Sequence, residues 1–423
     1  MSQFESLPLS RGLLSRARAG AQLPAVVVGA AACGLGLVRS LAKGNVPVIV
    51  IDTKEYEPAM RSRFARGVIV RALTGRALVG ELLALAKSLS GPAVLFPTTD
   101  EQVEAVSEFR TDLMGTYRFS LPRHQTLASL MSKSSFKAFA EAYGFPVPRS
   151  ITIEDASHLN RLSNLTYPCI IKSAIKNADY TRLQFPRAYR VTTKSQAATV
   201  CRQVLPVVPN LVVQEWIEGP DSEIYFCLQY RAADGSTVCS FTGRKLSIWP
   251  PDVGVTAACT AAPEVQPILQ PLTEVFFNAA SHVGMGSMEF KRDARNGQFF
   301  MIEPTVGRAD LQEEIATLHG ANIPLAAYFH EAGLEVPAVQ RSSRSVVWRG
   351  SWAHTGPAQV HNANRDGTPR SCRSYDAYWR LNDPMPALFH AGRLLGVIAI
   401  RSNGCLRKAW KWANSHLASS LKW

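Results

Sequence analysis

The chain has 423 residues, of which 46% are hydrophobic and 19% charged, and its formal net charge is +13. This length allows several domains with full hydrophobic cores, and the composition excludes a disordered, collagen-like or low-complexity protein. Eight scattered cysteines without a CxxC pair argue against a disulfide framework or a zinc knuckle and indicate reduced, mostly buried thiols.

The N-terminus shows no targeting signal. Residues 1–22 carry three arginines but no apolar core, so we expect a flexible basic tail rather than a signal peptide. The apolar run at 24–42 is interrupted by Arg39 and Ser40, and we predict no membrane span. These features, together with the thiols, predict a cytoplasmic protein.

From 23 to 125, apolar strands alternate with helical patterns, which predicts a parallel sheet with crossover helices. The first strand leads into glycines at 29, 34 and 36, and a second strand ends at Asp52. This spacing differs from the G-x-G-x-x-G pattern of dinucleotide-binding domains. A nicotinamide-dependent oxidoreductase therefore stays open only as a less favoured alternative. Thr98, Thr99 and Asp100 follow a strand, where open α/β sheets place ligand-facing groups.

The middle of the chain mixes helices with antiparallel strands. We expect a helix that begins near Lys133 and ends at Gly144, a short buried strand carrying Lys172, and strands "NLVVQEWIEG" and "SEIYFCLQY". The stretch "GRKLSIWPPDVG" is expected to be a loop, and helices are expected at 264–283 and about 310–319.

The stretch from Gly286 to Arg308 is typical of a β-hairpin with an Asn-Gly turn. The hairpin places Glu289 on one strand and Glu303 on its partner, where both carboxylates can meet one cation. Magnesium at a nucleotide site takes one or two carboxylates and completes its shell with phosphate. Two glutamates on a hairpin are also common on solvated surfaces, so the spacing alone does not decide between these interpretations.

The order of these features resembles the ATP-grasp superfamily, in which two α+β lobes hold ATP between them. "GRKLSIWPPDVG", "MEFKRD" and "GANIPLAAY" further resemble its carboxylate–amine ligase branch, which includes D-aspartate ligases. The resemblance covers about 126–335. It implies an α/β plus α+β fold: a Rossmann-like pre-ATP-grasp domain at 23–125, a two-lobed ATP-grasp domain at 126–335, and a basic, Trp-rich extension at 336–423.

The resemblance also implies the site residues. Two lysines would meet the ATP phosphates, an interlobe strand would receive adenine, and an acid would bind the ribose. Two glutamates with Thr305 would bind Mg²⁺ or Mn²⁺. An arginine would steady the transferred phosphoryl group, and this arginine and Lys172 would be the catalytic residues. The two lysines are Lys133 and Lys172. The adenine strand carries Gln214, Glu215, Trp216 and Ile217, and the ribose acid is Glu223. The two glutamates are Glu289 and Glu303, and the arginine is Arg308. Arg244 and Lys245 could also reach phosphate or a carboxylate substrate.

Two departures from the family pattern bear on activity. Thr305 stands where the family often has asparagine, which puts the second metal site in doubt. The phosphate-covering loop after Lys172 has no glycine, so side chains such as Lys176 and Arg187 would have to cover the phosphates, or the loop would become active only with substrate.

The resemblance implies an ATP-dependent ligase that joins a small-molecule carboxylate to an amine through an acyl phosphate. A nucleotide-binding protein that has lost ligase activity is the alternative. No nucleic-acid-binding motif accompanies the positive charge, so we expect no nucleic-acid partner. The sequence leaves the oligomeric state open.

The positive charge gathers at the C-terminus, where residues 341–423 hold 13 Lys and Arg against three Asp, together with six of the eight tryptophans. Residues 406–423 place Trp410 and four other apolar residues on one helical stripe. This helix either docks on its own protein or lies on the inner face of an anionic membrane. In the second case the substrate would be a lipid-linked cell-wall or polysaccharide precursor.

Overall fold

The computed structural model describes residues 22–173, 188–208, 210–250, 254–340, 345–350 and 372–392. The expected basic tail before residue 22, the loop residues Lys176 and Arg187 and the predicted helix at 406–423 lie outside these ranges. Across the described ranges, no helix combines the length and hydropathy that a membrane crossing requires.

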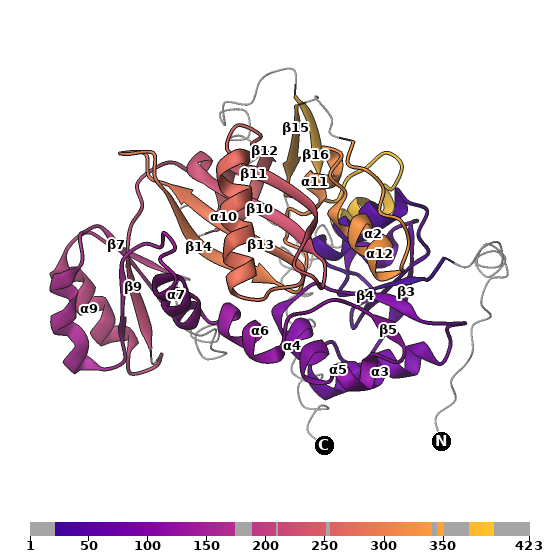
Figure 1. Cartoon of the computed structure of the whole chain (residues 1–423), viewed down its shortest axis with the longest axis horizontal. Coiled ribbons are helices and arrows are strands. Elements are labelled where there is room, and N and C mark those ends of the chain that lie inside the picture. Colours follow the sequence, from indigo (N-terminus) through magenta and orange to yellow (C-terminus); the bar gives the residue numbers. More distant parts are fainter. Residues whose placement is uncertain are drawn as a thin grey trace, which may run out of the picture.

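The N-terminal part is a five-stranded parallel sheet, as predicted, in the order β3-β2-β1-β4-β5. The helices α3, α4 and α5 lie together beside this sheet in Figure 1. Its strands are β1 (Ala25–Val28), β2 (Val48–Asp52), β3 (Ala65–Ile69), β4 (Ala93–Pro97) and β5 (Tyr117–Arg118). Its helices are α2 (Ala32–Ala42), η1 (Pro58–Arg61), α3 (Gly75–Ala86), α4 (Asp100–Glu108) and α5 (Arg110–Leu113).

The glycine-containing turn between β1 and α2 is stabilised by Asp52, the last residue of β2. Gly29 has a φ of +92°, and a Cβ on Gly34 would lie 2.0 Å from the Gly29 carbonyl oxygen. Asp52 accepts hydrogen bonds from the Ala30 N–H at 2.8 Å and the Lys54 N–H at 3.0 Å. The Asp52 carboxylate therefore stabilises the turn, a role that does not favour the nicotinamide interpretation.

A second, four-stranded antiparallel sheet has the order β6-β9-β7-β8 and its own small apolar core. It projects with α9 at the left of Figure 1. Its elements are β6 (Ser150–Ile153), η2 (Ala156–Asn164), β7 (Cys169–Ser173), β8 (Tyr189–Val191), α9 (Lys194–Val204) and β9 (Leu211–Glu215). Two helices, α6 (His124–Met131) and α7 (Lys133–Ala142), precede it. The single helix expected to end at Gly144 is thus two, because Ser132 has extended backbone and caps α7 by accepting from the Ser135 N–H.

The third sheet has seven strands in the order β14-β13-β10-β11-β12-β15-β16. The helix α10 crosses one face, while α2, α11 and α12 lie toward the five-stranded sheet (Figure 1). The strands are β10 (Ile224–Arg231), β11 (Thr237–Trp249), β12 (Val255–Ala261), β13 (Gly284–Arg292), β14 (Phe299–Val306), β15 (Val346–Arg349) and β16 (Arg373–Asp376). The helices are η3 (Asp221–Glu223), α10 (Gln266–Ala279), α11 (Glu314–Leu318) and α12 (Ile323–Glu331).

The prediction of a loop at "GRKLSIWPPDVG" was wrong for most of its length. Residues 243–249 belong to β11, which pairs with both β10 and β12. A central strand buries both faces and so accepts the bulky residues of this segment. The hairpin prediction is confirmed, with a turn that contains Asn296 and Gly297. The helix expected at 310–319 is shorter, because 307–313 form an irregular segment before α11.

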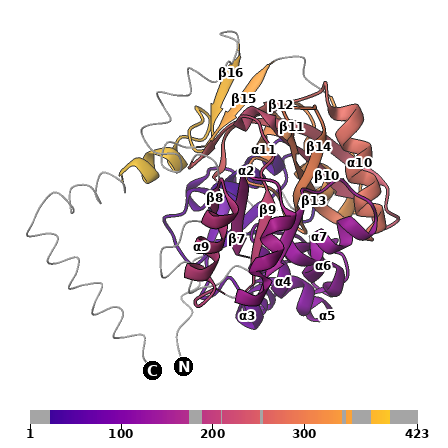
Figure 2. The same cartoon turned by 90° about the vertical axis from the view of Figure 1, so that its left-hand side faces the viewer.

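The described C-terminal strands lie at the edge of the large sheet, at the top of Figure 2. Arg39 of α2 anchors this region by an ion pair with Asp383 at 3.1 Å and by donating to the carbonyls of Ala377 and Tyr378, each at 2.7 Å. Both side chains of the ion pair are buried, at 7% and 1% exposure. Trp348 of β15 is also buried, so this tryptophan contributes to the core.

Candidate functional site

Glu289 and Glu303 face each other directly across the hairpin of β13 and β14. The register shifts immediately after this pair. Glu303 is exposed, whereas the Glu289 side chain is 25% exposed and lies 2.5 Å from the Lys245 ammonium. The structure thus brings together the two glutamates that the sequence predicted as metal ligands.

Negative charge exceeds positive charge at this pair. Burial raises the pKa of Glu289, and Glu303 and Asp310 raise it further while Lys245 opposes them. Burial by itself would lower the pKa of Lys245, but the nearby carboxylates, Glu289 first, raise it. A carboxylate excess of this kind favours binding of a cation.

Two carboxylates are enough for magnesium only when phosphate completes its shell. Within the part of the chain that the structure describes, no cluster of three or more His, Cys, Asp or Glu side chains could hold a metal by itself. The Thr305 hydroxyl donates to Asp310 at 3.1 Å, and Ser287 donates to the same carboxylate at 2.5 Å. The residues therefore fit a nucleotide-bound magnesium held by Glu289 and Glu303, with Thr305 bonded to Asp310.

Lys172 extends toward the hairpin from β7 of the small sheet. Its ammonium donates to the Gln214 side chain at 3.1 Å. Burial lowers the pKa of Lys172, and Lys133 lowers it further, while Glu303 and Glu289 act in the opposite direction. The two predicted phosphate lysines and the two predicted metal ligands thus share one electrostatic neighbourhood across the two sheets.

The predicted adenine strand is only partly free to bind a base. The Glu215 carboxylate accepts from the Thr166 N–H at 2.8 Å, so this side chain already has a structural role. The guanidinium of Arg190 lies 4.8 Å from the Trp216 ring, and Ile217 is 9% exposed. Beyond β9 the chain thus has a half-buried tryptophan beside a guanidinium and a buried isoleucine, while the Glu215 carboxylate holds the loop that contains Thr166.

Glu223 lies at the end of η3, where the chain enters β10. Arg292 is 3.8 Å away and the Tyr225 hydroxyl is 3.5 Å away, which are weak contacts for a half-buried carboxylate. The strand residue Arg244 pairs with Tyr225, whose side chain belongs to the core under α10. Lys245, the next residue, contacts Glu289, so of these two basic residues only Lys245 joins the glutamate pair.

Arg308 connects the hairpin to the N-terminal sheet. Its Nε lies 2.5 Å from Asp100, the first residue of α4, and Asp100 first and then Asp310 raise the pKa of the guanidinium against the effect of burial. Asp100 was expected to face a ligand, and it instead meets a residue predicted to act at the site. Sequence reasoning missed Asp310; its signal was a carboxylate two residues beyond Arg308.

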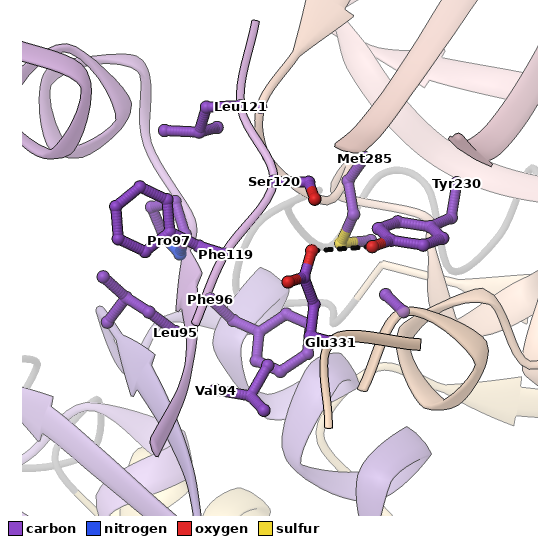
Figure 3. Close-up of a pocket in the computed structure, with 12 residues that line it drawn as sticks. Val94, Leu95, Phe96, Pro97, Phe119, Ser120, Leu121, Tyr230, Met285 and Glu331 are labelled. Carbon is purple, nitrogen blue, oxygen red and sulfur yellow. Dashed lines mark hydrogen bonds between the residues drawn. The ribbon is translucent and has the colours of Figure 1, made fainter. Parts of the chain in front are cut away.

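Figure 3 shows residues that line a small cavity between the N-terminal sheet and the large sheet. Gly307 is also one of its lining residues. The cavity volume of about 20 Å³ suits one water molecule rather than a substrate. The Tyr230 hydroxyl donates to the Glu331 carboxylate at 2.7 Å, drawn as a dashed line in Figure 3. This part of the junction between the two sheets, next to Gly307, is therefore too small to hold a substrate.

Comparisons with known proteins bear on the fold of the chain, and no family model matches it. A D-aspartate ligase of Enterococcus faecium is 20% identical over 279 residues, which is 62% of this chain and 66% of that protein, just under two thirds. The ADP complex of an N5-carboxyaminoimidazole ribonucleotide synthetase superimposes with a TM-score of 0.62 at 12% identity, covering 82% of this chain and 90% of that one.

The biotin carboxylase domain of the Hydrogenobacter thermophilus 2-oxoglutarate carboxylase, solved with magnesium ADP and bicarbonate, gives a TM-score of 0.60 at 13% identity. It covers 77% of this chain and 74% of that one. The chain has the ATP-grasp fold. The resemblance seen in the sequence is confirmed at this level.

Proposed function

We propose that this ATP-grasp protein is an ATP-dependent ligase that joins a carboxylate to an amine. The observation that carries the proposal is the pairing of Glu289 with Glu303 opposite Lys172 and Lys133. Two acids and two lysines from different lobes suit a magnesium nucleotide held between them. The similarity to a D-aspartate ligase supports the choice of a carbon–nitrogen ligase.

In this proposal Lys133 and Lys172 bind the ATP phosphates as point charges, and Trp216 and Ile217 line the adenine slot near Gln214 and the backbone of Glu215. Glu223 accepts from the ribose hydroxyls. Magnesium, when bound by Glu289 and Glu303, neutralises charge on the phosphates. Thr305 supports this site by fixing Asp310, with which it forms a hydrogen bond.

The chemistry has two steps. The substrate carboxylate attacks the terminal phosphorus, so that a carboxylate–phosphorus bond forms, ADP leaves and an acyl phosphate remains. The amine then attacks the acyl carbon, the bond to phosphate breaks, and an amide and inorganic phosphate are produced. In this proposal Arg308, which forms an ion pair with Asp100 at 2.5 Å, stabilises the negative charge of the acyl phosphate. Closing the lobes excludes water that would hydrolyse this intermediate.

We also propose three parts for the chain: a pre-ATP-grasp domain at 23–125, the ATP-grasp domain at 126–335, and the basic extension at 336–423. The substrates would be a small amino-acid-like carboxylate, such as the aspartate in the relative's name, and an amine. A lipid-linked precursor at the inner face of the membrane remains part of the proposal, through residues 406–423. Liposome flotation with and without those residues tests it, and equal binding would contradict it.

Release of ADP and phosphate tests the ligase proposal. With magnesium ATP, we expect turnover only when a carboxylate from a panel of D- and L-amino acids and an amine are both present. ATP binding without turnover across the panel would instead support a nucleotide-binding protein without ligase activity. This alternative is supported by Thr305, which stands where the family often has asparagine and donates a hydrogen bond to Asp310.

A further inference from the structure

Glu313 is a buried carboxylate that the proposed mechanism leaves unused. It lies directly before α11 and is 4% exposed. One oxygen, Oε2, accepts from the Asp310 N–H at 3.2 Å. The other, Oε1, has no hydrogen-bond partner among the described residues. A buried carboxylate oxygen without a partner is rare and costly, and it calls for a ligand or a functional reason.

The surroundings of Glu313 lack a free cation in the described part of the chain. Asp310 is the charged side chain that most affects it, and this second carboxylate adds to the negative charge. Arg308, which lies nearby, forms its ion pair with Asp100. Cys33 contacts the carbonyls of Ala309 and Asp310 at 3.5 Å, and burial raises the pKa of its thiol to about 12, so it stays neutral.

Glu313 is also close in the fold to the proposed phosphate and metal site. Asp310 accepts from Ser287 and Thr305, and each of these residues is two positions along a strand from a predicted metal ligand. Side chains two apart on a strand point to the same face. The Asp310–Glu313 segment therefore lies beside the glutamate pair on one face of the large sheet, where a second substrate would approach the acyl phosphate.

We propose that Glu313, together with Asp310, binds the ammonium group of the amine substrate. This inference rests on the proposed ligase function and names the site of its second substrate. A primary ammonium has three donors, which match the free Oε1 of Glu313 and the neighbouring carboxylate. A metal is a poorer occupant, because the described residues offer no cluster of three ligating side chains there.

The same carboxylate would prepare the amine for attack. The ammonium gives one proton to Glu313 and becomes a neutral amine, the amine forms the bond to the acyl carbon, and the bond between that carbon and phosphate breaks. The second amine proton leaves with the phosphate. Burial raises the pKa of Glu313 to about 8 when no amine is bound. A bound ammonium supplies the opposite charge that favours the ionised carboxylate, so Glu313 can then take the proton.

The test compares a charged amine with a neutral one. Hydroxylamine is largely uncharged near neutral pH and traps an acyl phosphate as a hydroxamate, so it does not need the ammonium site. L-Lysine is the cationic probe, and D-aspartate is the carboxylate. We expect Glu313→Gln to retain hydroxamate formation within about 3-fold and to lose about 10- to 100-fold in kcat/KM for L-lysine, the loss expected for a hydrogen bond between charged groups.

Equal losses with the two amines, or no loss with L-lysine, would overturn the inference. The exposed Glu264→Gln is the matched control and should change neither reaction. Absence of hydroxamate from the wild-type protein with every amino acid tested counts against the ligase proposal, not against this site. In that case a binding experiment still decides the inference.

The binding experiment measures melting temperature in methylammonium chloride and in tetramethylammonium chloride at equal ionic strength. Only methylammonium has N–H donors, so we expect it alone to raise the melting temperature of the wild-type protein. Glu313→Gln should abolish this difference, while Glu264→Gln should keep it. A wild-type protein that responds equally to both ions, or a Glu313→Gln variant that keeps the difference, would contradict the assignment.

Discussion

Lys245 contacts Glu289 at 2.5 Å, whereas Glu303, directly opposite Glu289 on the hairpin, is exposed. The pair of carboxylates therefore has one permanent cation, Lys245, which is 7% exposed, and one member, Glu303, that is exposed to solvent. Lys245 fixes Glu289 in place, and the proposed metal site uses Glu303 as its second carboxylate. This asymmetry leads to the first prediction.

Lys245→Met should leave Glu289, whose side chain is 25% exposed, without its partner. Removing one member of a fully buried ion pair costs about 3–5 kcal/mol, and because Glu289 is partly exposed we expect a smaller loss of about 2 kcal/mol in the free energy of unfolding. Magnesium should recover part of it in the presence of ATP, because a second cation then meets the carboxylates. Urea unfolding with and without magnesium ATP measures both effects. The exposed Lys194→Met is the control, and a similar small loss in both variants would contradict the prediction.

Arg39 and Asp383 join the N-terminal sheet to the C-terminal region. Asp383 also accepts from the Ser62 hydroxyl at 2.9 Å and the Arg63 N–H at 3.0 Å, so its replacement removes several bonds at once. We expect Asp383→Asn to lower the free energy of unfolding by about 3 kcal/mol. Asp112→Asn, in the more exposed pair with Arg76, should cost about 1 kcal/mol or less. Equal effects of the two changes on the melting temperature would contradict this.

The raised pKa of Glu313 predicts a pH dependence of stability. The folded protein holds this proton up to about pH 8, whereas the unfolded chain releases it near the ordinary glutamate pKa of about 4.3. The folded state thus binds more protons over this window, so the contribution of Glu313 to the free energy of unfolding falls as the pH rises through it. Glu313→Gln should flatten the dependence measured by urea unfolding. A variant that keeps the wild-type slope would show that other groups cause it.

Lys172→Met tests the phosphate contact across the lobes. Lys172 donates a hydrogen bond to Gln214, and both glutamates of the hairpin act on its pKa. Its removal should weaken ATP binding by about 10-fold or more, because the phosphates would lose a charged hydrogen bond. Adenosine binding should change little, because the lysine is expected at the phosphates. Calorimetry with both ligands separates the two cases. An equal loss for adenosine would mean that the lobe itself is disturbed.

Much of the fold could be predicted from the sequence, because the deciding signals are local. The parallel N-terminal sheet follows from alternating strand and helix patterns, and the hairpin follows from two strands and an Asn-Gly turn. The β11 segment was misread because its Pro and Gly residues lie at its end, while its pairing with two strands decides its structure.

The candidate site was predictable only in part, for a similar reason. Glu289 and Glu303 could be paired from their spacing on one hairpin. The contact of Arg308 with Asp100 joins residues that are 208 positions apart in the chain, so it depends on how the sheets pack. The contact of Glu313 with Asp310 depends on the irregular segment before α11. No periodic pattern in the sequence reports such contacts.

Magnesium-dependent binding of ATP to Glu303→Ala, compared with the wild-type protein and with the exposed control Glu264→Ala, tests the central claim most directly. We predict that the wild-type protein and the control bind ATP more tightly with magnesium than with a chelator. Glu303→Ala should lose most of that difference and all ADP release, because the metal keeps only Glu289. Magnesium-dependent ATP binding that Glu303→Ala leaves unchanged would contradict a nucleotide site at the hairpin.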